Sequence, residues 1–178
     1  MRCFIAIDLP EHVKAKVFHE FERLKQKNLF IGNFTEKENL HLTLKFLGDL
    51  NPEQIKNIID RLREIKFSEF YCKISNVGFF DSEKNIKIIF VDLVSEEVKE
   101  LYKEISKKIP EFKEDNKFTS HITIARVKSV NNQQALLNEV GKINLKKLDF
   151  RIDEFCLMKS ELMRNGPKYK IVEKFSLA

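Results

Sequence analysis

The chain has no tryptophan and only three cysteines, five glycines and four prolines among its 178 residues. Cys3, Cys72 and Cys156 are scattered without the paired spacing of a metal site or a disulfide framework, so we expect buried free thiols and a reducing, cytoplasmic environment. No apolar run approaches the ~18–20 residues of a membrane span. The first residues enter a strand directly and reach Asp8 without an apolar signal region, so we expect neither secretion nor membrane association.

No stretch rich in proline, glycine or serine divides the chain, which favours a single domain over 1–178. Hydrophobic residues make up 43% of the sequence and include sixteen phenylalanines, so we expect a large core rich in phenylalanine. The net charge of +5 favours anionic ligands only weakly, because 32 basic residues stand against 27 acidic ones. Most of these charges are expected to solvate the surface.

The pattern His-x-Thr-x occurs twice, beginning at His41 and again at His121, eighty positions later. Each copy lies in an apolar segment that alternates every second residue, which is the period of a half-buried strand. In such a strand His41 and Thr43 point to one side, as do His121 and Thr123. Two strands of this kind, brought together, would present two imidazoles and two hydroxyls to one shared space.

The eighty-residue offset extends to the segments around the two motifs. Asn51 and Asn131 each begin a polar segment that precedes an apolar helical run, and the apolar strand at the N-terminus resembles the one that reaches Asp92. Small differences in offset are expected from loop insertions. Two copies indicate an internal duplication, with halves of about 1–80 and 81–178, rather than a solenoid of three or more repeats.

Hydrophobic periodicity predicts the same order of strands and helices in both halves. The first half has expected strands over 3–9, 40–47 and 69–80 and helices over 11–27 and 52–65; the second has strands over 86–94, 119–127, 146–158 and 168–176 and helices after Ser95 and near 132–141. Turns are expected over 81–85 and 165–167. This order predicts an α+β fold of two related lobes, with antiparallel sheets, helices on the outside and a central cleft that carries both His-x-Thr-x strands.

The residue types of the two motifs limit the chemistry of the site. Zinc usually needs a third or fourth protein ligand, and no cysteine or carboxylate lies beside either motif in register. Ser120 adjoins His121 but points to the opposite strand face, which disfavours a serine nucleophile. Imidazole titrates near pH ~6.5, so a neutral base and a protonated acid coexist near neutrality. Phosphodiester displacement uses both, and the hydroxyls of Thr43 and Thr123 can hold the non-bridging oxygens.

Two cations are candidate additions to this site. By strict alternation Lys45 shares the strand face of His41 and Thr43, where it adds positive charge unless it is an exposed edge lysine. Arg126 follows His121 by five residues, so strict alternation points its side chain away. It joins the site only if the strand twists or bulges, or if the side chain reaches around the strand end.

With their flanking segments the two motifs resemble the signature of the 2H phosphoesterase superfamily. The segments 2–10, 38–48 and 121–126 narrow the resemblance to the RNA 2′,3′-cyclic phosphodiesterase branch, also called 2′-5′ RNA ligase, and the likeness covers essentially the whole chain. It implies a two-lobed fold in which the motifs face each other. It also implies metal-free hydrolysis of RNA 2′,3′-cyclic phosphate ends to 2′-phosphates, and a reverse, ATP-independent joining of RNA ends through a 2′-5′ linkage.

Carried over to this sequence, the resemblance implies that His41 and His121 are the acid–base pair and that Thr43, Thr123 and Arg126 bind phosphate oxygens. We expect His41 to protonate the leaving 3′ oxygen and His121 to activate water, although the sequence leaves this assignment open. No cofactor or metal is implied.

The expected partner is RNA with a 2′,3′-cyclic phosphate end, such as a tRNA fragment, or a cyclic nucleotide. We expect a monomer without an obligate protein partner. Phe34, Phe46 and Tyr169 are candidates for base stacking, although alternation places Phe46 on the apolar strand face and therefore in the core. Two alternatives stay open: a non-catalytic module that binds an RNA end or a phosphate, and the same chemistry on a different cyclic nucleotide.

Overall fold

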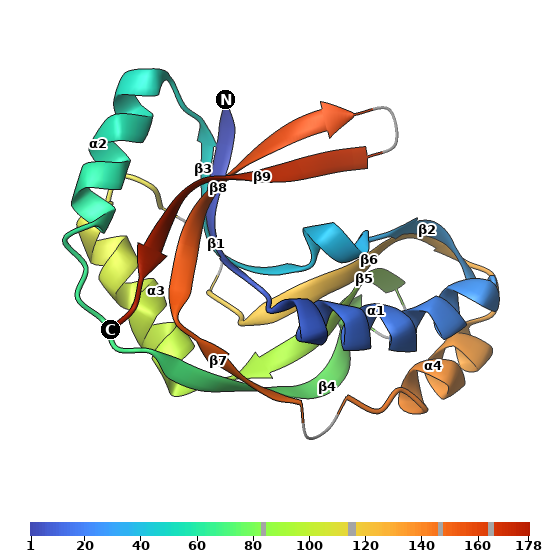
Figure 1. Cartoon of the computed structure of the whole chain (residues 1–178). Helices are drawn as coiled ribbons and strands as arrows, with labels where there is room; N and C mark the ends of the chain where they lie inside the picture. The colour runs from blue at the N-terminus through green and yellow to red at the C-terminus, as the bar shows by residue number, and fades with distance from the viewer. Residues whose placement is uncertain (83–84, 114–116, 146–147, 164–165) are drawn as a thin grey trace.

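The computed structural model of the chain describes residues 1–82, 85–113, 117–145, 148–163 and 166–178. These residues form one large antiparallel sheet and four α-helices that pack on one of its faces (Figure 1). The helices are α1 (Glu11–Gln26), α2 (Pro52–Leu62), α3 (Glu96–Lys108) and α4 (Gln133–Gly141), and a short 3-10 helix, η1 (Lys37–Asn39), precedes the third strand. In the described part of the chain, none of the helices has the length and apolar character needed to cross a membrane.

The sheet has nine strands, in the order β7-β4-β5-β6-β3-β1-β8-β9, with β2 paired to β6 beside β3. The strands are β1 (Arg2–Asp8), β2 (Phe30–Phe34), β3 (His41–Asp49), β4 (Phe70–Ser82), β5 (Asn85–Val94), β6 (His121–Val130), β7 (Asp149–Ile152), β8 (Glu154–Met163) and β9 (Gly166–Ser176). The predicted α+β class with helices outside antiparallel strands is confirmed. The two lobes are halves of one continuous sheet.

The two lobes meet between β3 and β6. One lobe contains β1, β3, β8 and β9, and the other contains β2, β4, β5, β6 and β7. Each lobe takes a strand from both parts of the chain, because β4 pairs with β5 and β7, whereas β8 pairs with β1 and β9. The lobes therefore differ from the consecutive sequence segments 1–80 and 81–178.

Two expectations for individual strands were wrong. The single strand expected over 146–158 is two strands, which separate at Asp153 because β7 pairs with β4 of one lobe and β8 continues to β1 of the other. The strand β2 was not expected, because five residues that include Gly32 and Asn33 carry little periodicity. Residues 83–84 and 165 of the two expected turns lie outside the described residues.

The main core lies between the sheet and the helices, where the expected apolar stripe of α1 is buried through Val13, Val17 and Phe21. A smaller cluster of Phe4, Ala6, Cys156 and Met158 lies on the opposite face of β1 and β8. All three cysteines are buried free thiols, as predicted. Burial raises the pKa of the Cys72 and Cys156 thiols to about 12, so both stay protonated.

Candidate active site

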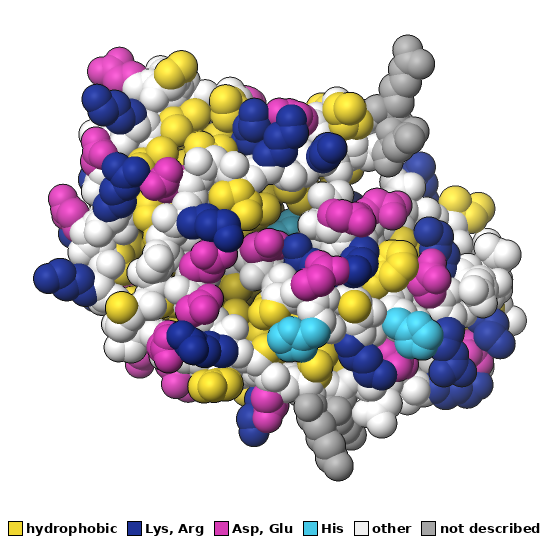
Figure 2. Space-filling model, viewed as in Figure 1, with side chains coloured by type: hydrophobic (Ala, Val, Ile, Leu, Met, Phe, Trp, Pro, Cys, Tyr) yellow, Lys and Arg dark blue, Asp and Glu magenta, His cyan; other side chains and the backbone are white. Residues whose placement is uncertain are grey.

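The two His-x-Thr-x motifs meet where the lobes join. Leu42 of β3 pairs with Ile122 of β6 in antiparallel orientation. Because the strands run in opposite directions through this pair, His41 lies toward Thr123 and Thr43 lies toward the second histidine. Both apolar partners are fully buried on the helix side, so the polar residues beside them face the other side of the sheet. Figure 2 shows a hollow near the centre of the molecule with a histidine side chain at its floor.

A β-bulge in β3 changes the alternation just after the first motif. Thr43 pairs with Ala6 and Lys45 pairs with Ile5, so Leu44 is an extra residue that has no partner position on β1. A bulge of this kind shifts the side chains that follow it, here Lys45 and Phe46, to the face opposite the one that alternation predicts.

The second motif is followed by the same bulge. Thr123 and Ala125 pair with consecutive residues of β5, so Ile124 is the extra residue. Arg126 is therefore on the face of His121, and its positive charge lowers the pKa of that imidazole. Arg126 was expected to join the site if the strand twists or bulges, and the structure has such a bulge.

The bulge in β3 also corrects two expectations. Lys45 does not share the face of His41, because its side chain lies beneath α3 with only 3% of its surface exposed. Its Nζ donates to Ser106 Oγ at 3.2 Å and lies 5.5 Å from the ring centre of Tyr102. Phe46 is not a core residue, because the same shift brings it to the other face, where it is 61% exposed.

Each imidazole is held by a main-chain carbonyl two residues before it. Nδ1 of His41 lies 2.6 Å from the carbonyl oxygen of Asn39, and Nδ1 of His121 lies 2.8 Å from that of Thr119. A carbonyl only accepts hydrogen bonds, so Nδ1 carries the proton and Nε2 remains for proton transfer. Nε2 of His41 lies 3.0 Å from Thr43 Oγ1, within the same motif.

Aromatic rings enclose His41. The ring centres of Phe4 and Tyr169 both lie 5.0 Å from its own. Burial lowers the pKa of His41 below its usual value, and this effect is larger than the opposite effects of the Asn39 carbonyl and of Asp8. The charge of the other catalytic candidate, His121, also lowers the pKa of His41.

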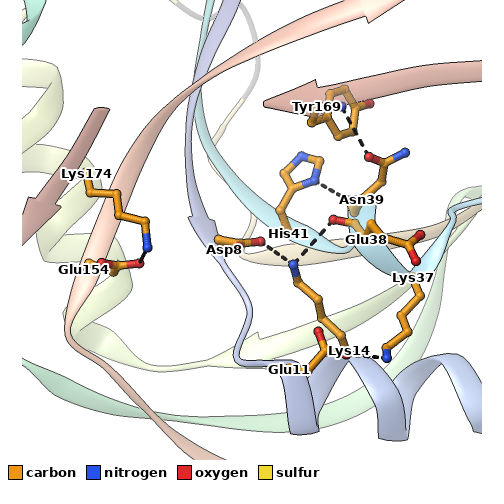
Figure 3. A network of polar contacts seen from close by, with 10 residues as sticks. All are labelled: Asp8, Glu11, Lys14, Lys37, Glu38, Asn39, His41, Glu154, Tyr169 and Lys174. Carbon is orange, nitrogen blue, oxygen red and sulfur yellow. Dashed lines mark hydrogen bonds and ion pairs between the residues drawn. The ribbon is translucent and has the colours of Figure 1, made fainter. Parts of the chain in front are cut away.

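An ion pair between a buried lysine and a half-buried aspartate lies next to His41 (Figure 3). Asp8 is the register partner of His41 on β1, and its carboxylate lies 2.6 Å from Nζ of Lys14. Lys14 is only 6% exposed and also donates to the carbonyl of Glu38 at 3.4 Å. Lys14 therefore ties α1 both to the end of β1 and to η1, which supplies the carbonyl that holds the imidazole.

The surroundings of His121 resemble those of His41, but they include Arg126 and have no counterpart of Lys14 among the described residues. Ring centres of Phe80 and Phe90 lie 4.8 and 5.6 Å from the imidazole, and burial lowers its pKa. Asp92 is its register partner, as Asp8 is that of the first histidine, and it raises the pKa of His121. Within the described residues no lysine or arginine lies within ion-pair distance of Asp92.

Sequence reasoning missed the residues that support the two histidines, although the aspartates at the ends of two similar apolar strands were visible as a repeated feature. It also missed the role of main-chain carbonyls, which no side-chain pattern encodes. Of the base-stacking candidates, Tyr169 lies beside the site, whereas Phe34 packs against Phe30 under Lys25 of α1. Among the described residues, no three histidine, cysteine or carboxylate side chains gather as a set of metal ligands.

Comparison with known proteins gives concordant matches. The model of the LigT-like phosphoesterase family matches the chain twice in succession, over 7–90 and 91–169. The RNA 2′,3′-cyclic phosphodiesterase of Methanocaldococcus jannaschii is 32% identical over 98% of this chain and 100% of that protein. The protein of the same name from Thermotoga maritima is 30% identical over 97% of this chain and 93% of that protein.

Among solved structures, TT0787 of Thermus thermophilus superposes with a TM-score of 0.84 and 26% identity, over 99% of this chain and 98% of that one. The matches cover both lobes and both His-x-Thr-x strands. The chain therefore belongs to the family of LigT-like phosphoesterases.

Proposed function

We propose that this protein hydrolyses 2′,3′-cyclic phosphate ends of RNA to 2′-phosphates, through its two histidines and without a metal ion. Water attacks phosphorus, the bond from phosphorus to the 3′ oxygen breaks, and the products are a 2′-phosphate and a free 3′-hydroxyl. One imidazole removes a proton from the water and the other gives a proton to the leaving oxygen, so no net proton is consumed.

The observation that carries this proposal is the pairing of Leu42 with Ile122, which sets the two motifs side by side. The relatives in Methanocaldococcus jannaschii and Thermotoga maritima carry the name of this activity, which supports the choice of substrate. Nδ1 of each ring is held by a carbonyl, so each Nε2 is the atom that exchanges protons.

The remaining residues of the site suit a phosphate. Thr43 and Thr123 stand beside the imidazoles as neutral hydroxyl donors, and Arg126 provides a permanent charge on the same face. Lys45 is left out of the proposal, because its ammonium group is buried on the other side of the sheet.

The same site can also catalyse the joining of two RNA ends, in which a 5′-hydroxyl takes the place of water. If the 5′-hydroxyl of a second RNA replaces water, it attacks phosphorus, the bond to the 3′ oxygen breaks, and a 2′-5′ linkage forms. This joining needs no ATP, because the cyclic phosphate is the activated group. Hydrolysis is favoured where water is in large excess over RNA ends.

The test is turnover of 2′,3′-cyclic mononucleotides and of short RNAs with cyclic phosphate ends in the presence of EDTA. His41→Ala and His121→Ala should each lower kcat by about 10²–10⁴-fold, since each removes one proton-transfer group. His19→Ala is the matched control, because His19 is exposed on α1 and should leave turnover unchanged. Binding without turnover would indicate a non-catalytic module, and turnover restricted to other cyclic nucleotides would change the substrate.

Our prediction that His41 is the acid and His121 the base has its own test. A substrate with sulfur in place of the leaving 3′ oxygen needs little protonation, because a thiolate is a good leaving group. His41→Ala should lose far less activity on this substrate than on the oxygen substrate, whereas His121→Ala should lose the same factor on both. The opposite result would exchange the two roles.

A further inference from the structure

The end of the β8–β9 hairpin is attached to the segment that holds His41. The hairpin arm is defined here as residues 160–163 and 166–170. The side chain of Asn39 donates from Nδ2 to the carbonyl of Pro167 at 2.8 Å. It also accepts from the main-chain N–H of Tyr169 at 3.4 Å (Figure 3). The carbonyl of the same asparagine accepts the hydrogen bond from the imidazole. One residue thus links the arm to the catalytic site.

One face of the hairpin arm continues the surface of the site outward. Ser160 pairs with Tyr169 and Leu162 pairs with Pro167, so these four side chains share a face of the two-stranded ribbon. The ring centres of Tyr169 and His41 lie 5.0 Å apart, so this face of the hairpin arm is the one directed toward the site. Leu162 is 84% exposed at the outer end. A mostly apolar strip therefore runs from the imidazole to the tip.

The opposite face of the hairpin arm is charged. Glu161 is bound by Lys159 at 2.9 Å and by Lys170 at 2.7 Å, which holds its pKa at about 2. Lys168 is exposed between Pro167 and Tyr169 on the strand. Lys159 and Lys170 are bound to Glu161, whereas Lys168 lies on the edge strand β9, from which its long side chain can reach around to the apolar face. A cation beside an apolar surface suits a nucleic-acid strand.

We propose that the hairpin arm binds the nucleotides that precede the cyclic phosphate end of an RNA strand, with a base packed on Leu162, Pro167 and Tyr169. The proposal rests on the proposed function and adds that oligonucleotide ends are preferred over cyclic mononucleotides. Every base has an apolar face, so such contacts tolerate any sequence. The backbone phosphates of this segment pass the edge of β9, which the long side chain of Lys168 can reach from the opposite face.

The position and size of the strip favour RNA over a protein partner. The strip consists of a few side chains and ends at a catalytic residue, so it offers a path for a strand whose end occupies the site. A stable protein interface buries about 1,200–2,000 Å² in total, far more than these side chains offer. An occupant that blocked His41 would also prevent turnover.

The test compares a cyclic mononucleotide with a tetranucleotide that ends in the same 2′,3′-cyclic phosphate. Leu162→Ser removes the exposed contact, and Met163→Ser is the matched control, because Met163 is its neighbour, 58% exposed and on the opposite face. Neither change alters charge. We expect the wild type to have a higher kcat/KM for the tetranucleotide, and Leu162→Ser to lower that value by roughly fivefold while leaving the mononucleotide unaffected.

Several outcomes would overturn the inference while leaving the proposed function intact. They are equal kcat/KM values for the two substrates in the wild type, an equal effect of the two serine variants, and a loss of mononucleotide turnover in Leu162→Ser. A dimer in sedimentation that Leu162→Ser dissociates would assign the strip to a second copy of the chain. Absence of turnover on both substrates in the wild type would instead refute the proposed function.

Discussion

At the scale of single residues, each histidine is surrounded by groups that oppose one another. Burial among aromatic rings lowers the pKa of both imidazoles, while a carbonyl and an aspartate at each one raise it. His41 differs from His121 because Lys14 lies within 2.6 Å of its aspartate. The two halves of a symmetrical motif are thereby placed in unequal electrostatic surroundings. Lys14 favours the neutral form of His41 and Arg126 favours that of His121, so the sulfur substrate, and not these shifts, decides which ring is the acid.

The pH dependence of turnover follows from these shifts. The proposed reaction needs one neutral and one protonated imidazole, and both pKa values are held below the ordinary 6.5. We therefore expect a bell-shaped profile of kcat/KM centred below pH ~6.5. Activity should fall as the pH rises above the centre, because the protonated partner is lost. A profile centred above neutrality would contradict this reading of the site.

Lys14 should set the position of that profile. Lys14→Met removes a charge that lowers the pKa of His41 and frees Asp8, which raises it. The side of the pH profile that reports the titration of His41 should therefore move to higher pH. Lys16→Met is the control, because Lys16 pairs with Glu20 on the outer side of the same helix. A loss of kcat with an unmoved profile would show that Lys14 is only structural.

At the scale of elements, one irregularity decides which side chains reach the site. The extra residues Leu44 and Ile124 stand one place after the threonine of each motif. They turn Lys45 and Ala125 toward the helices and leave the next residue of each strand on the catalytic face. The equivalent bulges place Phe46 of β3 and Arg126 of β6 on the face of the two histidines. Equivalent positions in the two lobes therefore carry an aromatic ring in one case and a positive charge in the other.

The corrected placement of Lys45 can be tested against that of Arg126. Lys45→Met should leave kcat/KM within about twofold and the melting temperature unchanged or higher, because an apolar chain of similar size replaces a buried charge. Arg126→Ala should lower kcat/KM by about tenfold or more, as expected for loss of a charged hydrogen bond to phosphate. Steady-state kinetics with thermal unfolding measures both. A large loss of activity in Lys45→Met would support the original expectation that Lys45 adds positive charge to the site.

The pairing of β2 with β6 should help to hold the main chain of Arg126 in position. A Cβ atom at Gly32 would overlap the carbonyl oxygen of Arg126, so Gly32→Ala must push the two strands apart. We expect a loss of about 1–3 kcal/mol in the free energy of unfolding, together with lower activity. Gly141→Ala, at a site with no neighbour within 4 Å, is the matched control and should be neutral or slightly stabilising. Equal effects in the two variants would contradict this account.

At the scale of the whole molecule, the two lobes are joined by an exchange of strands. β4 leaves the first part of the chain to pair with β5, and β8 returns from the second part to pair with β1. Neither part of the chain can then close its own sheet or bury its own core. The proposed catalytic surface exists only at the junction of β3 and β6, where both parts are present.

This exchange predicts how fragments behave. Two separate chains, divided between β4 and β5, should each lack cooperative unfolding in circular dichroism, because β4 and β8 would have lost their partners. An equimolar mixture should recover a folded species and measurable turnover, with the intact chain as the reference. Cooperative folding of either fragment alone would show that its lobe is complete without the exchanged strand.

The sequence by itself determined the local features of this protein. Periodicity and capping residues are local, so most strands, the helices and the alternating faces of the two motifs were predictable from them. Asn51, for example, caps α2 in a reciprocal pair of hydrogen bonds with Gln54. The repeated His41 and His121 pattern was visible for the same reason, because each copy is a short motif with its own period.

Tertiary structure decided what local patterns do not encode. A bulge depends on the partner strand, so the faces of Lys45, Phe46 and Arg126 were fixed only when β1 and β5 took their places in the sheet. The exchange of β4 and β8 depends on contacts between residues far apart in the chain. The electrostatic difference between the two histidines likewise arises from Arg126 at one and from Lys14 at the other, and Lys14 reaches Asp8 only because α1 packs back against the end of β1.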